Sequence, residues 1–278
     1  MRRAALALAL ALGLALLAGS ALFSPAGADS RMQSSCIALA GMPQAVHRVA
    51  FGDPLPEDAV RIRFLGHASF ALQTPGGMLA VTDYTGFTGN PLVVPDVVTM
   101  NNAHDTHFTD TPDAAIAHVL RGWGRFGFPA VVDLEVGDLR VRNVTTDLRG
   151  PFGEGSRKDG NSIFIFEAAG LCIAHLGHLH QIPSAAQYAS IGRVDVLMVP
   201  VDGGFTLDLD SLVGVVRRLR PRLVLPMHWF DGAALTRFQA AMAEDFDIVE
   251  ADGPEVVVGL DRLPAVPQML LLDPGLIP

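Results

Sequence analysis

The sequence predicts an α/β protein built as an αββα sandwich, in which two mixed β-sheets pack face to face and helices cover both outer faces. Two observations predict this class. Short segments with strand-like patterns dominate the first part of the core, and helical and strand-like segments alternate in the second. Because every sheet must bury apolar faces, two packed sheets with helices outside satisfy this order of elements.

The N-terminus has the three parts of a secretory signal peptide. Arg2 and Arg3 supply positive charge, residues 4–17 are apolar, and Ala26–Ala28 is typical of a cleavage site. We therefore expect residues 1–28 to be removed and the mature protein to be exported, either to a periplasm or out of the cell. An uncleaved membrane anchor is the alternative, but the apolar run is short for a membrane span.

Residues 29–58 have no regular pattern, and Pro43, Pro54 and Pro56 interrupt them. We expect an irregular segment there and a single domain over residues 59–278. The two cysteines, Cys36 and Cys172, lie in this irregular segment and in an apolar strand, respectively. Two free thiols are the expected state, and one disulfide is the alternative that export would permit.

The first part of the core should consist mainly of strands. Thr111 suits an N-cap and Pro112 suits a first helical position, so residues 111–121 predict a helix among these strands. A glycine-rich loop is expected at residues 150–160, and a hairpin should turn at Ala169-Gly170. Strands are predicted at residues 60–65, 69–73, 78–84, 95–100, 138–144, 161–168 and 170–176.

The second part of the core should alternate between helix and strand. Helices are expected at residues 184–192, 208–220 and 232–246, with buried strands at 194–201 and 222–226. In the second of these helices, apolar side chains recur on one face, and Pro221 ends it. The apolar positions are Leu212, Val215, Val216 and Leu219.

The composition limits the partners. The 278-residue chain has a formal net charge of −9, and losing Arg2 and Arg3 would make it more negative. Such a surface repels nucleic acid and anionic lipid, so we expect a small-molecule substrate, no nucleic acid, and no membrane contact after signal cleavage. The sequence leaves the oligomeric state open.

Seven of the nine histidines lie at or next to predicted strand ends. Histidine is the commonest metal ligand, and loops at strand ends are where folds place function. One such histidine is usually an ordinary polar group, but several in separate loops indicate a site. They are His67, His104, His107, His175, His178, His180 and His228.

Five motifs, in order, resemble the metallo-β-lactamase superfamily. They are GHASF at 66–70, TDY at 82–84, NNAHDTHF at 101–108, AHLGHLH at 174–180 and PMHWF at 226–230. The stretch from 161 to 230 is especially similar to the branch of ascorbate-phosphate lactonase-like hydrolases. The resemblance implies the αββα fold of that superfamily and a metal-dependent hydrolase.

The metal-binding motif departs from the pattern of that family. The family's His-x-His-x-Asp-His falls on Asn102, His104, Thr106 and His107, so one histidine and one aspartate are replaced. The family's bridging aspartate falls at His178. No histidine stands near Thr146-Asp147, where another ligand is expected, whereas His228 retains the last one.

The resemblance implies a site with two metal ions bridged by a carboxylate, and these departures favour a single ion. A carboxylate can bridge two cations, but a neutral imidazole offers one lone pair and cannot. The remaining His104, His107, His178 and His228 suit one tetrahedral zinc ion, or another divalent transition metal. With an open position, zinc would lower the pKa of a bound water to about 7 and generate hydroxide. The alternative is a decayed site in which the histidines bond to one another.

Further residues are candidates for supporting roles or for extra ligands. His67 is expected to orient ligands, His175 to be structural, and Asp83 either to accept a proton from a ligating imidazole or to be a simple turn residue. Arg149, Arg157 and Lys158 are expected in a solvated loop. The other candidates, as supporting groups or ligands, are Asn102, Thr106, Asp147 and His180.

The function expected from these features is an exported metal-dependent hydrolase that cleaves an ester, lactone or phosphoester bond through a zinc-bound hydroxide. The alternative is a non-catalytic metal- or ligand-binding protein on the same fold, which the threonine at position 106 favours. Residues 122–127, GWGRFG, match G-x-G-x-x-G but follow a predicted helix, so we interpret them as a connection and not as a nucleotide site.

Overall fold

The computed structural model describes residues 32, 34–37, 54–150 and 155–278. The predicted signal peptide and most of the predicted irregular segment lie outside these residues. Residues 33–278 form one compact unit, in which the first strand begins at Ala59. None of the helices in the described ranges has the length and apolar composition needed to cross a membrane.

One sheet has six strands in the order β13-β1-β2-β3-β4-β5. Its first four strands pair antiparallel, and β3, β4 and β5 run parallel. The parallel part matters for function because neighbouring parallel strands end at the same edge. The bounds are β1 Ala59–Gly66, β2 Ser69–Gln73, β3 Leu79–Val81, β4 Val97–Met100, β5 His118–Arg121 and β13 Glu255–Gly259.

The other sheet has eight strands in the order β12-β14-β11-β10-β9-β8-β7-β6. Strands β9, β10, β11, β14 and β12 run parallel to one another, and β6 to β9 form an antiparallel meander. The bounds are β6 Asp133–Val136, β7 Leu139–Arg149, β8 Ser156–Ala168, β9 Leu171–His175, β10 Val196–Pro200, β11 Leu223–Met227, β12 Asp247–Glu250 and β14 Gln268–Leu271.

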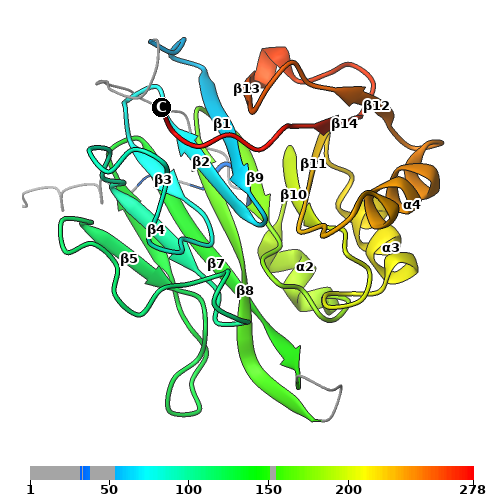
Figure 1. Cartoon of the computed structure of the whole chain (residues 1–278), viewed down its shortest axis with the longest axis horizontal. Helices are drawn as coiled ribbons and strands as arrows, with labels where there is room; N and C mark the ends of the chain where they lie inside the picture. The colour runs from blue at the N-terminus through cyan, green and yellow to red at the C-terminus, as the bar shows by residue number, and fades with distance from the viewer. Residues whose placement is uncertain (1–31, 33, 38–53, 151–154) are drawn as a thin grey trace, which may run out of the picture. The chain divides into compact units, whose positions relative to one another are not determined.

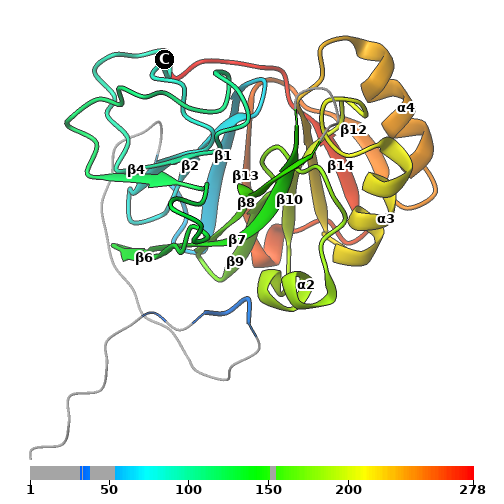
Figure 2. The same ribbon diagram turned by 90° about the horizontal axis from the view of Figure 1, so that it is seen from below.

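The two sheets pack face to face, as the sequence predicted. The layer between them is apolar and includes Ile62, Phe70, Phe164 and Phe166, all fully buried. Figures 1 and 2 show α2 (Ala185–Ile191), α3 (Leu209–Leu219) and α4 (Gly232–Met242) along the outer side of the eight-stranded sheet. Burying these apolar faces supplies the main stabilisation of such a sandwich.

The sequence correctly predicted the three helices. Ser184 forms a capping box with Gln187 at the start of α2, and Asp208 and Asp231 cap α3 and α4. On α3, Leu212, Val215 and Val216 are fully buried against the sheet. The hairpin at Ala169-Gly170 also forms as expected.

The six-stranded sheet differs from the prediction on its outer face. There the described residues form loops, which pack on Val98 and Met100, and no helix. The helix predicted at 111–121 is wrong: Asp113 closes a local turn by accepting from the Ala115 N–H, and residues 118–121 become β5, paired with β4. Residues 111–113 resemble a helix start but form a turn, because residues 118–121 pair with β4 instead of continuing a helix.

Two further predictions are corrected. The loop expected at 150–160 is shorter, because β7 runs to Arg149 and pairs there with Ser156 of β8. The prediction of two free thiols is also wrong, because Cys36 and Cys172 form a disulfide. Ser34 donates to Glu167 at 2.6 Å, which further fixes this segment on the core. The pattern around Cys36 could not show this, since its partner is 136 residues away.

Candidate metal centre

The predicted strand-end histidines do meet in space. His104 and His107 follow β4, His178 and His180 follow β9, and His228 follows β11. Ring centroids of His104, His107, His178 and His228 lie 4.5–5.9 Å apart. The structure therefore brings together the four residues that the sequence proposed as ligands.

His67 also belongs to this cluster, although the sequence predicted only a supporting role. It lies in the turn between β1 and β2, and its ring centroid is 4.2 Å from that of His228. His67, His104, His107 and His228 each place one ring nitrogen within 4.8 Å of the others. The Nε2 atom of His67 is buried and has no hydrogen-bond partner. A bound cation would satisfy this atom.

Backbone strain gathers at the cluster. His67, Asp83 and His228 have φ values of 51°, 41° and 56°, in the left-handed region that non-glycine residues seldom adopt. Such strain persists where the surrounding structure fixes it and is typical of functional sites. Gly177 precedes His178 at φ 61°, and a Cβ there would meet Asn101 and Asn161 at 2.5 Å. Only glycine fits at that point of the loop.

Two carboxylates fix the orientation of two rings. Asp83 Oδ2 accepts from His107 Nδ1 at 2.7 Å, and Asp202 Oδ2 accepts from His228 Nδ1 at 2.8 Å. A neutral ring with its proton on Nδ1 carries a lone pair on Nε2. The Nε2 atoms of these two rings lie 3.1 Å apart, so two lone pairs face each other. A cation between them would remove that repulsion.

The spacing of the nitrogens fits one tetrahedral ion. With Zn–N bonds of about 2.0–2.1 Å, the nitrogens of a tetrahedral site would lie roughly 3.3–3.4 Å apart. The Nε2 atoms of His107 and His228 are 3.1 Å apart, close to that spacing. The donor set is also suitable, because imidazole nitrogen is a preferred zinc ligand.

Burial keeps five of these rings neutral, which is the form that binds metal. Burial lowers the pKa of His67 to about 3 and that of His180 to about 4, with neighbouring positive groups adding to the effect. Burial likewise lowers the pKa of His104, His107 and His178.

The two carboxylates respond differently to their surroundings. Burial raises the pKa of Asp83 to about 6, against the hydrogen bond from Asn101. Burial also opposes ionisation of Asp202, but hydrogen bonds from His228 and Thr206 outweigh it and lower the pKa of that carboxyl. Both groups are mainly ionised at neutral pH and can therefore accept the Nδ1 protons.

The remaining predicted residues lie in different places. Thr106 bonds His104 Nδ1 through its hydroxyl at 2.8 Å, and His180 Nε2 lies 2.6 Å from His178 Nδ1. His175 is buried and donates to the Ala68 carbonyl, so its role is structural. Asn102 accepts from Arg157 through its backbone, and Asp147 accepts from the Asp159 N–H. In the described part of the chain, neither Asn102 nor Asp147 bonds to a histidine of the cluster.

Sequence reasoning missed two residues that hold the cluster. Asp202 follows the strand β10 and accepts from the backbone N–H groups of 204–206 as well as from His228. Asn101 donates to Asp83 at 3.0 Å. The available signal was position: Asn101 directly follows β4 and Asp202 lies two residues after β10, and both strands are buried.

Aromatic rings flank the cluster on its exposed side. Phe205 and Phe230 are 67% and 63% exposed, and their ring centroids lie 5.3 Å apart. Phe230 in turn lies 5.6 Å from His67 and 5.3 Å from His228. Arg149, expected to be free in solvent, instead donates to three backbone carbonyls of 204–206 and braces this loop.

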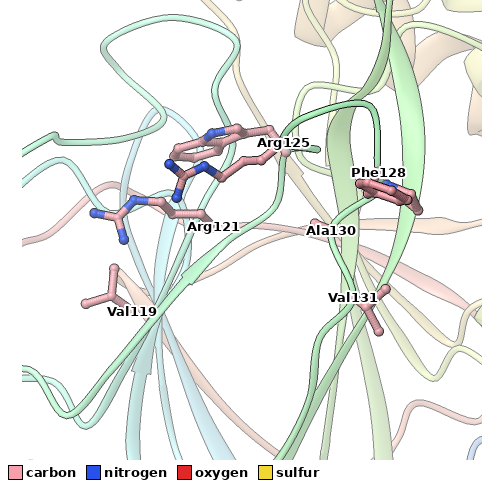
Figure 3. Close-up of a pocket in the computed structure, with 8 residues that line it drawn as sticks. Val119, Arg121, Arg125, Phe128, Ala130 and Val131 are labelled. Carbon is pink, nitrogen blue, oxygen red and sulfur yellow. The ribbon is translucent and has the colours of Figure 1, made fainter.

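A separate cavity of about 290 Å³ lies beside β5. Figure 3 shows Arg121 and Arg125 on one side of it and Phe128 and Val131 on the other. The GWGRFG segment follows β5 and not the predicted helix, but it forms a tight turn with no helix after it, so it is a connection as expected. The cavity shares no residue with the histidine cluster.

The sequence matches known proteins over most of this unit. A family model described as a beta-lactamase superfamily domain matches residues 61–228, more than half of the chain. A UPF0173 metal-dependent hydrolase of Pyrococcus abyssi is 26% identical over 222 residues, covering 72% of this chain and 96% of the relative. A UPF0173 protein of Pyrococcus furiosus is 27% identical over 192 residues, covering 61% and 83%.

Solved structures share the fold. A protein of Thermotoga maritima, described as a Zn-dependent hydrolase of the metallo-β-lactamase superfamily, superposes with a TM-score of 0.55 at 23% identity and covers 77% of this chain and 98% of its own. A metallo hydrolase of Ignicoccus hospitalis gives a TM-score of 0.50 at 17% identity, with 73% and 99% covered. At these identities, the likeness supports the fold alone.

Proposed function

Because the chain belongs to the metallo-β-lactamase superfamily, we propose that it is an exported hydrolase that uses one zinc ion to cleave an ester, lactone or phosphoester bond of a small molecule. The observation that carries the proposal is the facing pair of His107 and His228. Their Nε2 atoms lie 3.1 Å apart while carboxylates hold both Nδ1 protons.

His104, His107 and His228 would hold the ion, together with a fourth imidazole from His67 or His178, and the ion would expand its coordination to accept water. Bound there, zinc would polarise a substrate oxygen and lower the pKa of a coordinated water. The protein's own part is to orient the rings: Asp83 and Asp202 fix the Nδ1 protons of His107 and His228. Such outer hydrogen bonds set ring direction and ligand basicity.

Other residues would bind the substrate. Phe205 and Phe230 form an exposed apolar rim beside the histidines. Contiguous exposed apolar surface often marks a ligand-binding site. We assign them to an apolar part of the substrate, from which they would exclude water.

A non-catalytic metal-binding protein is the second candidate. Thr106 stands where the family carries an aspartate, and it bonds His104. The two carboxylates at the cluster are both engaged with histidines. No carboxylate of the described cluster is therefore free to accept a proton from water, which favours this candidate.

The test compares zinc content and hydrolysis in the same samples. Purified protein is loaded with zinc and assayed on an aryl ester, a lactone and an aryl phosphodiester, beside a chelator-treated sample and His107→Ala. We expect about one zinc per chain and hydrolysis of one class only in the loaded parent. Zinc without hydrolysis would support the second candidate, and absence of zinc after loading would refute both.

The disulfide supports the proposed export. Disulfides persist in oxidising compartments and are rare in the reducing cytosol of mesophiles. The Cys36–Cys172 bond is consistent with the signal-like N-terminus. Detecting the mature N-terminus after residue 28 in extracellular or periplasmic material would test this part, and a cytosolic full-length chain would contradict it.

A further inference from the structure

We propose that His178 is a hydrogen-bond donor aimed at the reacting ligand and is not a metal ligand, so that the ion is held by His67, His104, His107 and His228. This inference rests on the proposed function, since it concerns the same site. It also changes the ligand set expected from the sequence. The observation behind it is a chain of hydrogen bonds that fixes where the proton of His178 lies.

This series of hydrogen bonds begins at a backbone N–H, which can only donate. The backbone N–H of Arg149 donates to Nδ1 of His180 at 2.7 Å. A neutral imidazole has one N–H, so the proton of His180 must lie on Nε2. That atom lies 2.6 Å from Nδ1 of His178. His180 therefore donates to His178, and Nδ1 of His178 is an acceptor.

The same reasoning fixes the proton of His178 on its other nitrogen. With Nδ1 accepting, the single proton of the neutral ring lies on Nε2. Nε2 lies 3.2 Å from Nε2 of His104 and donates to its lone pair. An ion bound to His104 would take that lone pair and leave the His178 N–H to donate to a ligand of the ion. An N–H has no lone pair to offer a metal. Coordination through this atom would require His180 to lose its only proton or to break its bond with Arg149.

The other rings have the opposite arrangement. His107 and His228 donate from Nδ1 to carboxylates, which leaves Nε2 with a lone pair. His104 can donate from Nδ1 to the Thr106 hydroxyl, at 2.8 Å. His67 has a buried Nε2 without a partner. These four are also the group whose nitrogens lie within 4.8 Å of one another.

The role of His178 follows from its direction. In the family pattern this position is a carboxylate, which accepts protons and attracts cations. An N–H at the same place would instead stabilise negative charge on an oxygen at the cluster. Substrates whose reaction builds up such charge, at a phosphoester or at an attacked carbonyl, are the class it serves. The 178 side chain would thus contribute an oxyanion contact and leave the coordination to the other four histidines.

Nuclear magnetic resonance tests the proton position directly. Long-range ¹H–¹⁵N spectra of the ¹⁵N-histidine-labelled protein, assigned with His178→Gln, should show His178 protonated on Nε2 both before and after zinc is added. His107 should show its Nε2 signal move on zinc loading. A zinc-induced shift of the His178 Nε2 signal, with the proton on Nδ1, would overturn the proposal.

Zinc stoichiometry of matched variants supplies an independent readout. We expect His178→Gln to retain about one zinc per chain, while His67→Gln and His107→Gln lose it after dialysis against a weak chelator. Affinity of His178→Gln should fall by no more than about 100-fold, the range for groups that support ligands. Zinc loss in His178→Gln equal to that in His107→Gln, with His67→Gln unaffected, would refute the assignment.

A third variant and the metal-free spectrum separate failure of this inference from failure of the proposed function. His180→Phe removes the donor to His178, so the spectrum should show both tautomers of His178 in place of one. If the parent binds no zinc, the proposed function fails, yet the tautomer of His178 is still measured in the metal-free protein. If zinc binds but His178 carries its proton on Nδ1, this inference alone fails.

Discussion

The Nε2 atoms of His107 and His228 face each other at 3.1 Å, and a carboxylate holds the opposite nitrogen of each ring. Without an ion, this contact places two lone pairs against each other in a buried site. The folded chain therefore keeps an unfavourable arrangement that a cation would convert into a favourable one. Two of the predictions below follow from that relationship.

Zinc should stabilise the folded protein. A ligand that binds only the native state, at about 100 times its Kd, adds roughly 2.7 kcal/mol. Thermal unfolding should therefore shift upward with zinc and downward with a chelator. The variant His107→Ala/His228→Ala should show no zinc-dependent shift, whereas an equal shift in that variant would place the ion elsewhere.

Asp202→Asn should weaken zinc binding without removing a ligand. The amide can no longer accept the His228 proton as a carboxylate does, and loss of such a support typically costs about 10–100-fold in metal affinity. Competition with a coloured chelator measures the change. Asp245→Asn is the matched control, because Asp245 pairs with Arg217 of the outer helix α3. An unchanged affinity in Asp202→Asn would contradict the role given to that carboxylate.

The metal-free protein should lose stability as the pH falls below about 6.5. The pKa of His67 is lowered to about 3 and that of His180 to about 4, so between these values and 6.5 the unfolded chain binds protons that the folded chain does not. Stability then rises with pH. Asp83, with a pKa of about 6, acts in the opposite direction but is a single group.

Urea unfolding from pH 7 to pH 4.5 checks this dependence, with metal removed throughout. His180→Gln should flatten the slope, because it deletes one of the rings that stay neutral. A midpoint that is independent of pH, or that increases toward pH 4.5, would contradict the burial of neutral histidines.

Breaking the disulfide should destabilise the fold. Cys36 and Cys172 are 136 residues apart, and removing a native disulfide typically costs about 2–5 kcal/mol. The urea midpoint of the parent should fall when a reductant is added, while Cys36→Ser should start low and not respond. Identical midpoints for parent and Cys36→Ser would show that the bond contributes nothing.

Phe230→Ala should impair binding of substrates with an apolar group. Fully burying a phenylalanine side chain contributes about 1.5–3 kcal/mol, so partial burial by a substrate predicts a KM increase of roughly tenfold. Steady-state kinetics on aryl and small alkyl esters of the same acid would measure it, with zinc content as the control. Equal effects on both esters would argue against an apolar contact.

The sequence predicted the two-sheet sandwich and the three helices because these rest on local patterns. The buried strands 196–200 and 223–227 and the capped helix α3 carry their own signals. By contrast, β5 was expected to be part of a helix, since Thr111 and Pro112 look like a helix start. Pairing with β4 decided its structure, and pairing is a property of the folded chain.

The candidate site was predictable in part. Spacing and strand ends identified the histidines that meet, but they could not reveal that His67 joins them from the β1–β2 turn. Nor could they show that Arg149 directs the proton of His178 through His180. That depends on one backbone N–H from β7, which is distant in sequence and has no residue-type signature.

The Cys36–Cys172 bond also has a consequence for maturation. In a chain that crosses a membrane N-terminus first, Cys36 arrives long before strand β9, which carries Cys172. In such a chain, the Cys36 thiol would have to stay reduced, or in a mixed disulfide, until most of the sandwich has crossed the membrane. The native disulfide can form only late in export, so an oxidant that acted earlier would oxidise Cys36 before Cys172 is available.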